Sequence, residues 1–154
     1  MSFNNTETIS NEYDSFETAN QAGDEFRSSS QYLKAAAAYE ACIKFAPKAF
    51  LVRLKLGLCF AVLNDRKRKL EAMNGIASCD LQSSANALRV TSALIKTESR
   101  TAAIAVLDES LKRWPNHPEL RQELLTTLVG NKNTTTKNYL DRMTEIANHN
   151  PPSS

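Results

Sequence analysis

The fold is decided by the stretch at residues 16–49, FETANQAGDEFRSSSQYLKAAAAYEACIKFAPKA. Its apolar residues recur at the spacing of an amphipathic helix. Three serines at 28–30 interrupt the pattern, and Pro47 ends it because proline lacks a backbone N–H and disfavours a helical residue before it. The stretch therefore predicts two short antiparallel helices joined by a tight turn.

The same alternation of helical pattern and break continues along the chain. Four glycines and five prolines in 154 residues, with abundant Ala, Leu, Lys and Glu, favour helices over a sheet. We therefore predict an all-α protein. The predicted helices span residues 13–28, 31–45, 49–63, 66–78, 84–96, 100–113, 118–129 and 135–148.

Residues of similar size return every 34 positions in three windows that begin at residues 16, 50 and 84. The equivalent sets are Gly23, Gly57 and Thr91; Phe26, Phe60 and Leu94; Ala35, Lys69 and Ala103; Tyr39, Met73 and Leu107; and Pro47, Leu81 and Pro115. Small residues let helix axes approach, and large residues fill the remaining space. We expect the set that contains Tyr39 to pack against the following helix pair.

This pattern resembles the tetratricopeptide repeat family. The first window carries the family's signature at Gly23, Phe26, Tyr32, Ala35, Tyr39, Cys42 and Pro47. The second window has Arg66 and Lys69 where an aromatic residue and an alanine are usual, and the third lacks the glycine. The resemblance implies antiparallel helix-pair repeats that form a short right-handed α-solenoid.

The expected organisation is a single repeat domain at residues 13–149. It comprises units 16–49, 50–83 and 84–117 and a degenerate capping unit at 118–149. A mobile polar tail at residues 1–12 precedes the domain, and a disordered end at residues 150–154 follows it, because both segments hold few large apolar side chains.

In the family, the first helix of each pair lines a concave groove that holds a peptide or a partner helix. The matching positions are Glu17, Asn20, Gln21, Asp24, Arg27, Leu51, Leu54, Lys55, Leu58, Val62, Ala85, Leu88, Arg89, Ser92 and Lys96. The partner-binding candidates among them are Leu51, Leu54, Lys55, Leu58, Val62, Leu88, Arg89 and Ser92. Aliphatic anchors would meet the leucines, and acidic or carbonyl groups would meet Lys55 and Arg89.

Two alternatives to a partner stay open at this groove. The spacing of Leu51, Leu54 and Leu58 also suits a helix buried by its own neighbours, and the chain's own terminal segments could fill the groove. Some family members grip a terminal carboxylate with Lys, Asn and Arg residues. Only Arg89 agrees with that set, so binding of such tails is disfavoured.

The run Arg66, Lys67, Arg68 and Lys69 is a candidate contact for an acidic partner. It stands at a predicted helix start, where cations oppose the macrodipole. The alternatives are a phosphate contact, a nuclear-import sequence, or a solvated turn capped by Asp65. A net charge of +2 and the lack of interleaved aromatics disfavour nucleic-acid binding.

Neither catalytic nor metal-binding motifs stand out. Cys42, Cys59 and Cys79 are widely spaced, and His117 and His149 have no carboxylate or cysteine at ligand spacing. We read Cys42 and Cys59 as core residues and expect no enzyme activity and no cofactor. No apolar run approaches a membrane span, and the polar start is unlike a signal peptide, so we expect a cytoplasmic protein without membrane insertion.

The function that these features predict is a non-catalytic adaptor or chaperone-like module that binds another polypeptide. One alternative is a subunit or chaperone of a bacterial secretion or pilus assembly. The small size, the three and a half repeats and the acidic N-terminal end of this chain are similar to those of secretion chaperones. Another is a helper domain for a glycosyl- or sulfotransferase. A homo-oligomer is compatible with each of these functions.

Overall fold

The computed structural model describes residues 13–130, 140–141 and 143–145, and this part of the chain is helical and contains no strand. The predicted all-α class is thereby confirmed. The tail expected at 1–12 and the end expected at 150–154 lie outside the described residues. Of the helix predicted at 135–148, residues 140–141 and 143–145 are described and are helical.

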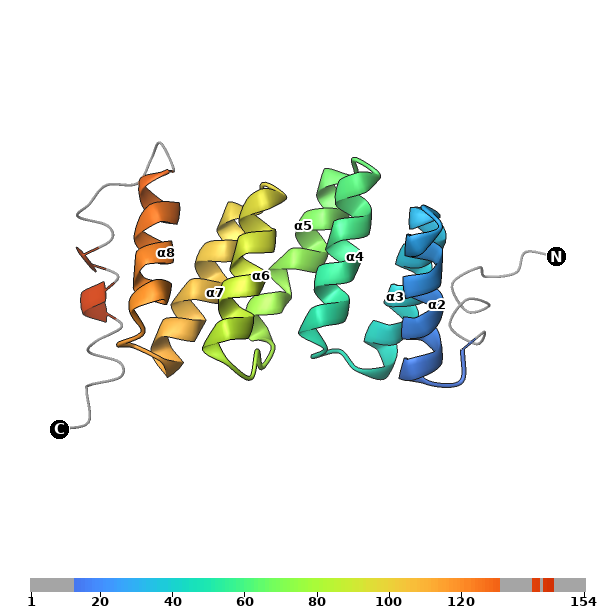
Figure 1. The fold of residues 1–154 in the computed structure, drawn as a ribbon, viewed down its shortest axis with the longest axis horizontal. Coiled ribbons are helices and arrows are strands. Elements are labelled where there is room, and N and C mark those ends of the chain that lie inside the picture. Colours follow the sequence, from blue (N-terminus) through green and yellow to red (C-terminus); the bar gives the residue numbers. More distant parts are fainter. Residues whose placement is uncertain (1–12, 131–139, 142, 146–154) are drawn as a thin grey trace. The chain divides into compact units, whose positions relative to one another are not determined.

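The described helices form two compact units, divided between Asp80 and Leu81. In the first unit, α2 (Phe16–Ser28) packs against α3 (Tyr32–Phe45), α3 against α4 (Phe50–Val62), and α4 against α5 (Arg66–Asn74), which is followed by the short 3-10 helix η1 (Ile76–Ser78) (Figure 1). In the second unit, α7 (Arg100–Arg113) packs against both α6 (Ser84–Lys96) and α8 (Pro118–Val129).

The observed helix boundaries lie close to the predicted ones, with two differences. The helix predicted from residue 13 begins at Phe16, after the N-cap Ser15. The helix predicted at 66–78 ends at Asn74, where Gly75 is the C-cap, and the chain continues as η1. Glycine is a poor helix former because its backbone loses the most conformational freedom on ordering. The α-helix therefore stops at Gly75 although the apolar pattern continues.

Helix starts recur at intervals of 34 residues. The helices α2, α4, α6 and α8 begin at residues 16, 50, 84 and 118, and α3, α5 and α7 begin at residues 32, 66 and 100. These positions follow the sequence windows without a gap.

The turn that ends the first helix of each pair also recurs. Ser30, Asn64 and Glu98 have φ angles of 59°, 59° and 57°, in the left-handed region. In each turn, the next amide donates to a carbonyl five residues earlier: Gln31 to Phe26 at 2.8 Å, Asp65 to Phe60 at 2.9 Å, and Ser99 to Leu94 at 2.8 Å. This hydrogen bond is the longer bond of a Schellman motif. Three different residues thus adopt the same turn.

Arginines secure the connection that precedes two of the first helices. The Nε of Arg53 donates to the carbonyl of Pro47 at 2.8 Å in the first unit, and the Nε of Arg121 donates to that of Pro115 at 2.6 Å in the second. Both pairs are six residues apart in the chain.

The core of the first unit depends on close contacts at two glycines. A Cβ at position 23 would lie 2.5 Å from Cε1 of Tyr39, and one at position 57 would lie 2.5 Å from Sδ of Met73. Tyr39 and Met73 are fully buried. The large residues therefore fill space inside their own helix pairs, and Tyr39 also contacts the following pair, since Lys55 lies 5.7 Å from its ring centre.

Thr91 takes the glycine position in the core of the second unit. It is fully buried, and within the described part of the chain its hydroxyl has no hydrogen-bond partner. Val90 and Leu94 on α6 and Val106 and Leu107 on α7 are also buried. A buried hydroxyl without a partner reduces stability because its desolvation is not compensated.

We predict that Gly23→Ala lowers the free energy of unfolding by about 1 to 3 kcal/mol because the added methyl group meets the rigid ring of Tyr39. Gly57→Ala is the matched control. Its methyl group meets the flexible side chain of Met73, and the helix propensity of alanine offsets the remaining cost. Urea unfolding of both variants measures the difference. An equal or larger cost for Gly57→Ala would contradict this packing account.

Thr91→Val should raise the stability of the protein by about 1 kcal/mol, since it removes an unpaired buried hydroxyl at nearly constant volume. The control is Thr127→Val, because the buried Thr127 donates its hydroxyl to the Glu123 carbonyl at 2.7 Å and should lose stability on the same change. Thermal unfolding compares the two variants. A destabilised Thr91→Val would show that the hydroxyl is satisfied.

Candidate functional site

One side of α4 exposes aliphatic side chains. Leu51 and Val62 are 51% and 59% exposed, Leu58 is partly buried between them, and Lys55 lies on the same side of the helix. We call Leu51, Lys55, Leu58 and Val62 the α4 face. The opposite side, with Val52, Leu56, Cys59 and Phe60, is buried in the core of the first unit.

Leu54 does not belong to this exposed surface. Only 9% of its surface is accessible, so it serves intramolecular packing. The predicted leucine positions of α4 therefore differ in their role. Leu54 is buried by neighbouring helices, as the alternative interpretation expected, whereas Leu51 and Val62 are exposed to a partner.

Lys55 is held by side chains of α2. Its ammonium donates to both carboxylate oxygens of Asp24, at 3.0 and 3.2 Å, and to Oδ1 of Asn20 at 3.2 Å. Its side chain is 14% exposed. Three acceptor atoms match the three protons of an ammonium group. The ammonium group of Lys55 thus binds side chains of the protein itself. The sequence had instead suggested that it contacts an acidic ligand.

Asp24 is the centre of this network. It also accepts a hydrogen bond of 2.5 Å from the Tyr39 hydroxyl and lies 3.7 Å from the guanidinium of Arg27. Burial acts to raise the pKa of Asp24, but the hydrogen bonds from Tyr39 and Lys55 and the nearby positive charges outweigh it, so that the pKa lies below 3.8. Burial and the bond to Asp24 raise the pKa of Tyr39. One carboxylate therefore joins α2, α3 and α4.

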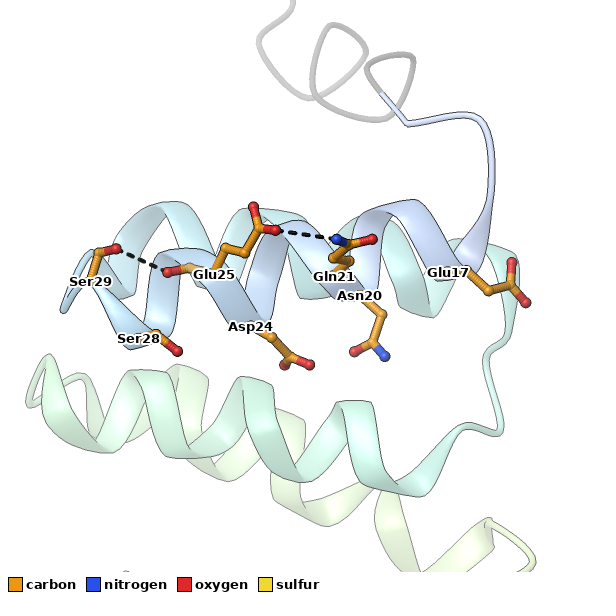
Figure 2. A pocket seen from close by; sticks show the side chains of 7 residues that line it. All are labelled: Glu17, Asn20, Gln21, Asp24, Glu25, Ser28 and Ser29. Carbon is orange, nitrogen blue, oxygen red and sulfur yellow. Dashed lines mark hydrogen bonds between the residues drawn. The ribbon is translucent and has the colours of Figure 1, made fainter.

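The exposed side of α2 is polar and hollowed (Figure 2). Asn20 and Asp24 extend toward α4, whereas Glu25 points to the other side of α2. Gln21 donates to Glu25 at 3.3 Å. We call this surface the α2 polar face; its residues are Glu17, Asn20, Gln21, Asp24, Glu25, Ser28 and Ser29.

The remaining groove candidates lie on α6 in the second unit. Arg89 and Ser92 are exposed, and Leu88 is partly buried. Within the described residues, Arg89 forms no ion pair.

Two residues of the basic run at 66–69, Arg68 and Lys69, are engaged within the protein itself. Asp65 caps α5, as in the alternative of a capped turn: its Oδ1 accepts the backbone N–H of Arg68 at 3.1 Å. The Arg68 guanidinium lies 3.6 Å from Asp65 and 5.7 Å from the centre of the Phe60 ring, and Lys69 is buried. Arg66 and Lys67 are exposed.

The cysteines and His117 have structural roles in the described part of the chain. Cys42, Cys59 and Cys79 are buried free thiols, and burial raises the pKa of Cys42 to about 11, which disfavours a nucleophilic thiolate. His117 accepts the N–H of Leu120 at the start of α8. Across the described ranges, no group of three or more His, Cys, Asp or Glu residues could hold a metal ion.

Comparison with known proteins gives no family assignment: no family model and no curated protein matches this chain. Among the helices that the structure describes, none combines the length and apolar character that crossing a membrane requires.

The Asp24 network should make stability depend on pH. Because the pKa of Asp24 is lowered in the folded state, its contribution is complete above the unfolded-state value near 3.8 and is lost as the pH falls through the lower folded value. We expect wild type to exceed Asp24→Asn in unfolding free energy at pH 6, by about 1 kcal/mol or less because the carboxylate is partly exposed.

Urea unfolding of both proteins between pH 6 and about pH 2 tests this expectation. The contributions of the other carboxylates cancel in the difference between the two unfolding free energies. A difference that stays constant over the whole range would show that the charge of Asp24 has no stabilising role.

Proposed function

We propose that this protein is a non-catalytic, tetratricopeptide-like module that binds another polypeptide through the α4 face. The observation that carries the proposal is the exposure of Leu51 and Val62 on a helix whose opposite side is well packed. Burial of such side chains by a partner contributes about 25 cal/mol per Å² of apolar surface. A partner that fully buries a Leu or Val side chain gains about 1.5 to 3 kcal/mol from it.

Three recurring features support the repeat part of the proposal. Helix starts are spaced by 34 residues, the left-handed turns at Ser30, Asn64 and Glu98 recur, and Arg53 and Arg121 make equivalent bonds. A period of 34 is that of the tetratricopeptide repeat. These features favour antiparallel helix-pair repeats that build a short right-handed α-solenoid. Three free thiols also fit the reducing conditions of the cytoplasm.

A charged group on the α4 face should abolish binding and leave the fold intact. The test variant is Leu51→Asp with Val62→Asp, and the control is Leu33→Asp, because Leu33 is 64% exposed and belongs to α3 rather than to α4. Affinity capture from extract of the native cells, after circular dichroism has shown that all proteins are folded, compares the polypeptides retained by each.

The proposal predicts a polypeptide that wild type and Leu33→Asp retain and that the double variant loses by at least about tenfold, since two anchors of more than about 1 kcal/mol are removed. If the folded double variant retains the same polypeptides as wild type, the α4 face is not the binding surface.

A further inference from the structure

The residues of the α4 face follow the spacing of a coiled-coil seam. The four residues of this face are separated by four, three and four positions, so that alternate members are seven residues apart. Helices pack along such a stripe because a repeat of 3.5 residues keeps one side of each helix toward its partner. At a rise of about 1.5 Å per residue, the seam is about 16 Å long. Its spacing therefore favours a helix as the partner.

The α4 face is complementary to itself when two copies of α4 run antiparallel. In one register, Leu51 of each copy lies opposite Val62 of the other. Lys55 then lies opposite Leu58, because the two pairs have the same midpoint along the helix. Every residue of the face thus meets another residue of the same face, as the two-fold symmetry of a homodimer requires.

The charge of Lys55 does not oppose this contact. Its ammonium is bound by Asp24 and Asn20 of α2, and its side chain is 14% exposed. The two copies of Lys55 therefore bring paired charges to the centre of the contact, and their aliphatic stems are free to lie against Leu58. A single lysine in an apolar seam also specifies the register of the two helices.

The charges of α2 are likewise complementary to those of a second copy. Glu17 stands in the first turn of α2 and Arg27 in its last turn. Since α2 lies alongside α4 (Figure 1), a two-fold rotation that reverses α4 also reverses α2. Glu17 of each copy then lies toward Arg27 of the other. Because Asp24 and Lys55 also balance, two such surfaces do not repel each other.

We propose that the α4 face is the contact of a two-fold homodimer, in which α4 packs antiparallel against α4 of a second copy. Leu51, Leu58 and Val62 supply the apolar contacts, and Glu17 and Arg27 flank them with opposite charges. This inference rests on the proposed function and names the partner polypeptide as a second copy of this chain. The contact is short, so we expect a dissociation constant in the roughly micromolar range.

Sedimentation equilibrium of the full chain, from about 5 to about 500 µM, tests the association. We expect a monomer–dimer equilibrium that folded Leu51→Asp with Val62→Asp weakens by at least about tenfold, because charges enter an apolar contact. The control is Leu33→Asp with Val129→Asp, which adds the same charge at exposed sites on α3 and α8. Its dissociation constant should equal that of wild type.

Cysteine crosslinking tests the antiparallel register. Leu51→Cys and Val62→Cys are prepared as separate variants, and the native Cys42, Cys59 and Cys79 are buried. Under mild oxidation, the mixture of the two variants should form a disulfide-linked dimer on a non-reducing gel. Each variant alone should not, since identical positions lie about 16 Å apart along the seam, beyond the reach of a disulfide.

The possible failures of the inference and of the proposed function differ. A chain that stays monomeric at the highest concentration, a dimer that persists in Leu51→Asp with Val62→Asp, or crosslinks within one cysteine variant alone would overturn the homodimer. If affinity capture then still yields a different polypeptide that the aspartate variant loses, the proposed function stands. If neither a second copy nor another polypeptide depends on these two residues, both are overturned.

Discussion

The aromatic ring of Tyr39 lies against α2 because position 23 carries no side chain, and much of the first unit depends on this contact. The close approach brings the Tyr39 hydroxyl within 2.5 Å of Asp24, whose carboxylate then holds the ammonium of Lys55 on α4. One glycine thereby positions three helices. The equivalent contact of Gly57 with Met73 continues the packing into α5, without a polar network.

The same network determines which surface is left for a partner. With Lys55 held against α2, the exposed side of α4 presents Leu51 and Val62, and α2 contributes acidic side chains such as Glu17. Beside these aliphatic side chains, the charge of Lys55 is paired with that of Asp24. This surface therefore lacks the free cation that the position of Lys55 in the sequence suggests.

Helices and repeat spacing could be predicted from the sequence because both follow from apolar periodicity and from the sizes of residues such as Gly23 and Tyr39. The pairing of Lys55 could not be predicted, since its partner Asp24 is distant in sequence and stands at a position that the resemblance assigned to a ligand contact. The sequence placed a turn between residues 96 and 100, but not the left-handed backbone of Glu98, because glutamate rarely adopts a positive φ. The structure shows that Leu54 is buried and Leu51 exposed, and helical spacing alone does not distinguish the two.

The central claim is that the α4 face is the contact surface for a polypeptide, and methyl NMR tests it directly. In a chain labelled at Leu and Val methyl groups, addition of a peptide that the protein retains should shift the signals of Leu51, Leu58 and Val62 and leave that of Leu33 unchanged. Shifts confined to Leu33 or to methyl groups of α7 and α8, with Leu51 and Val62 unperturbed, would contradict the account.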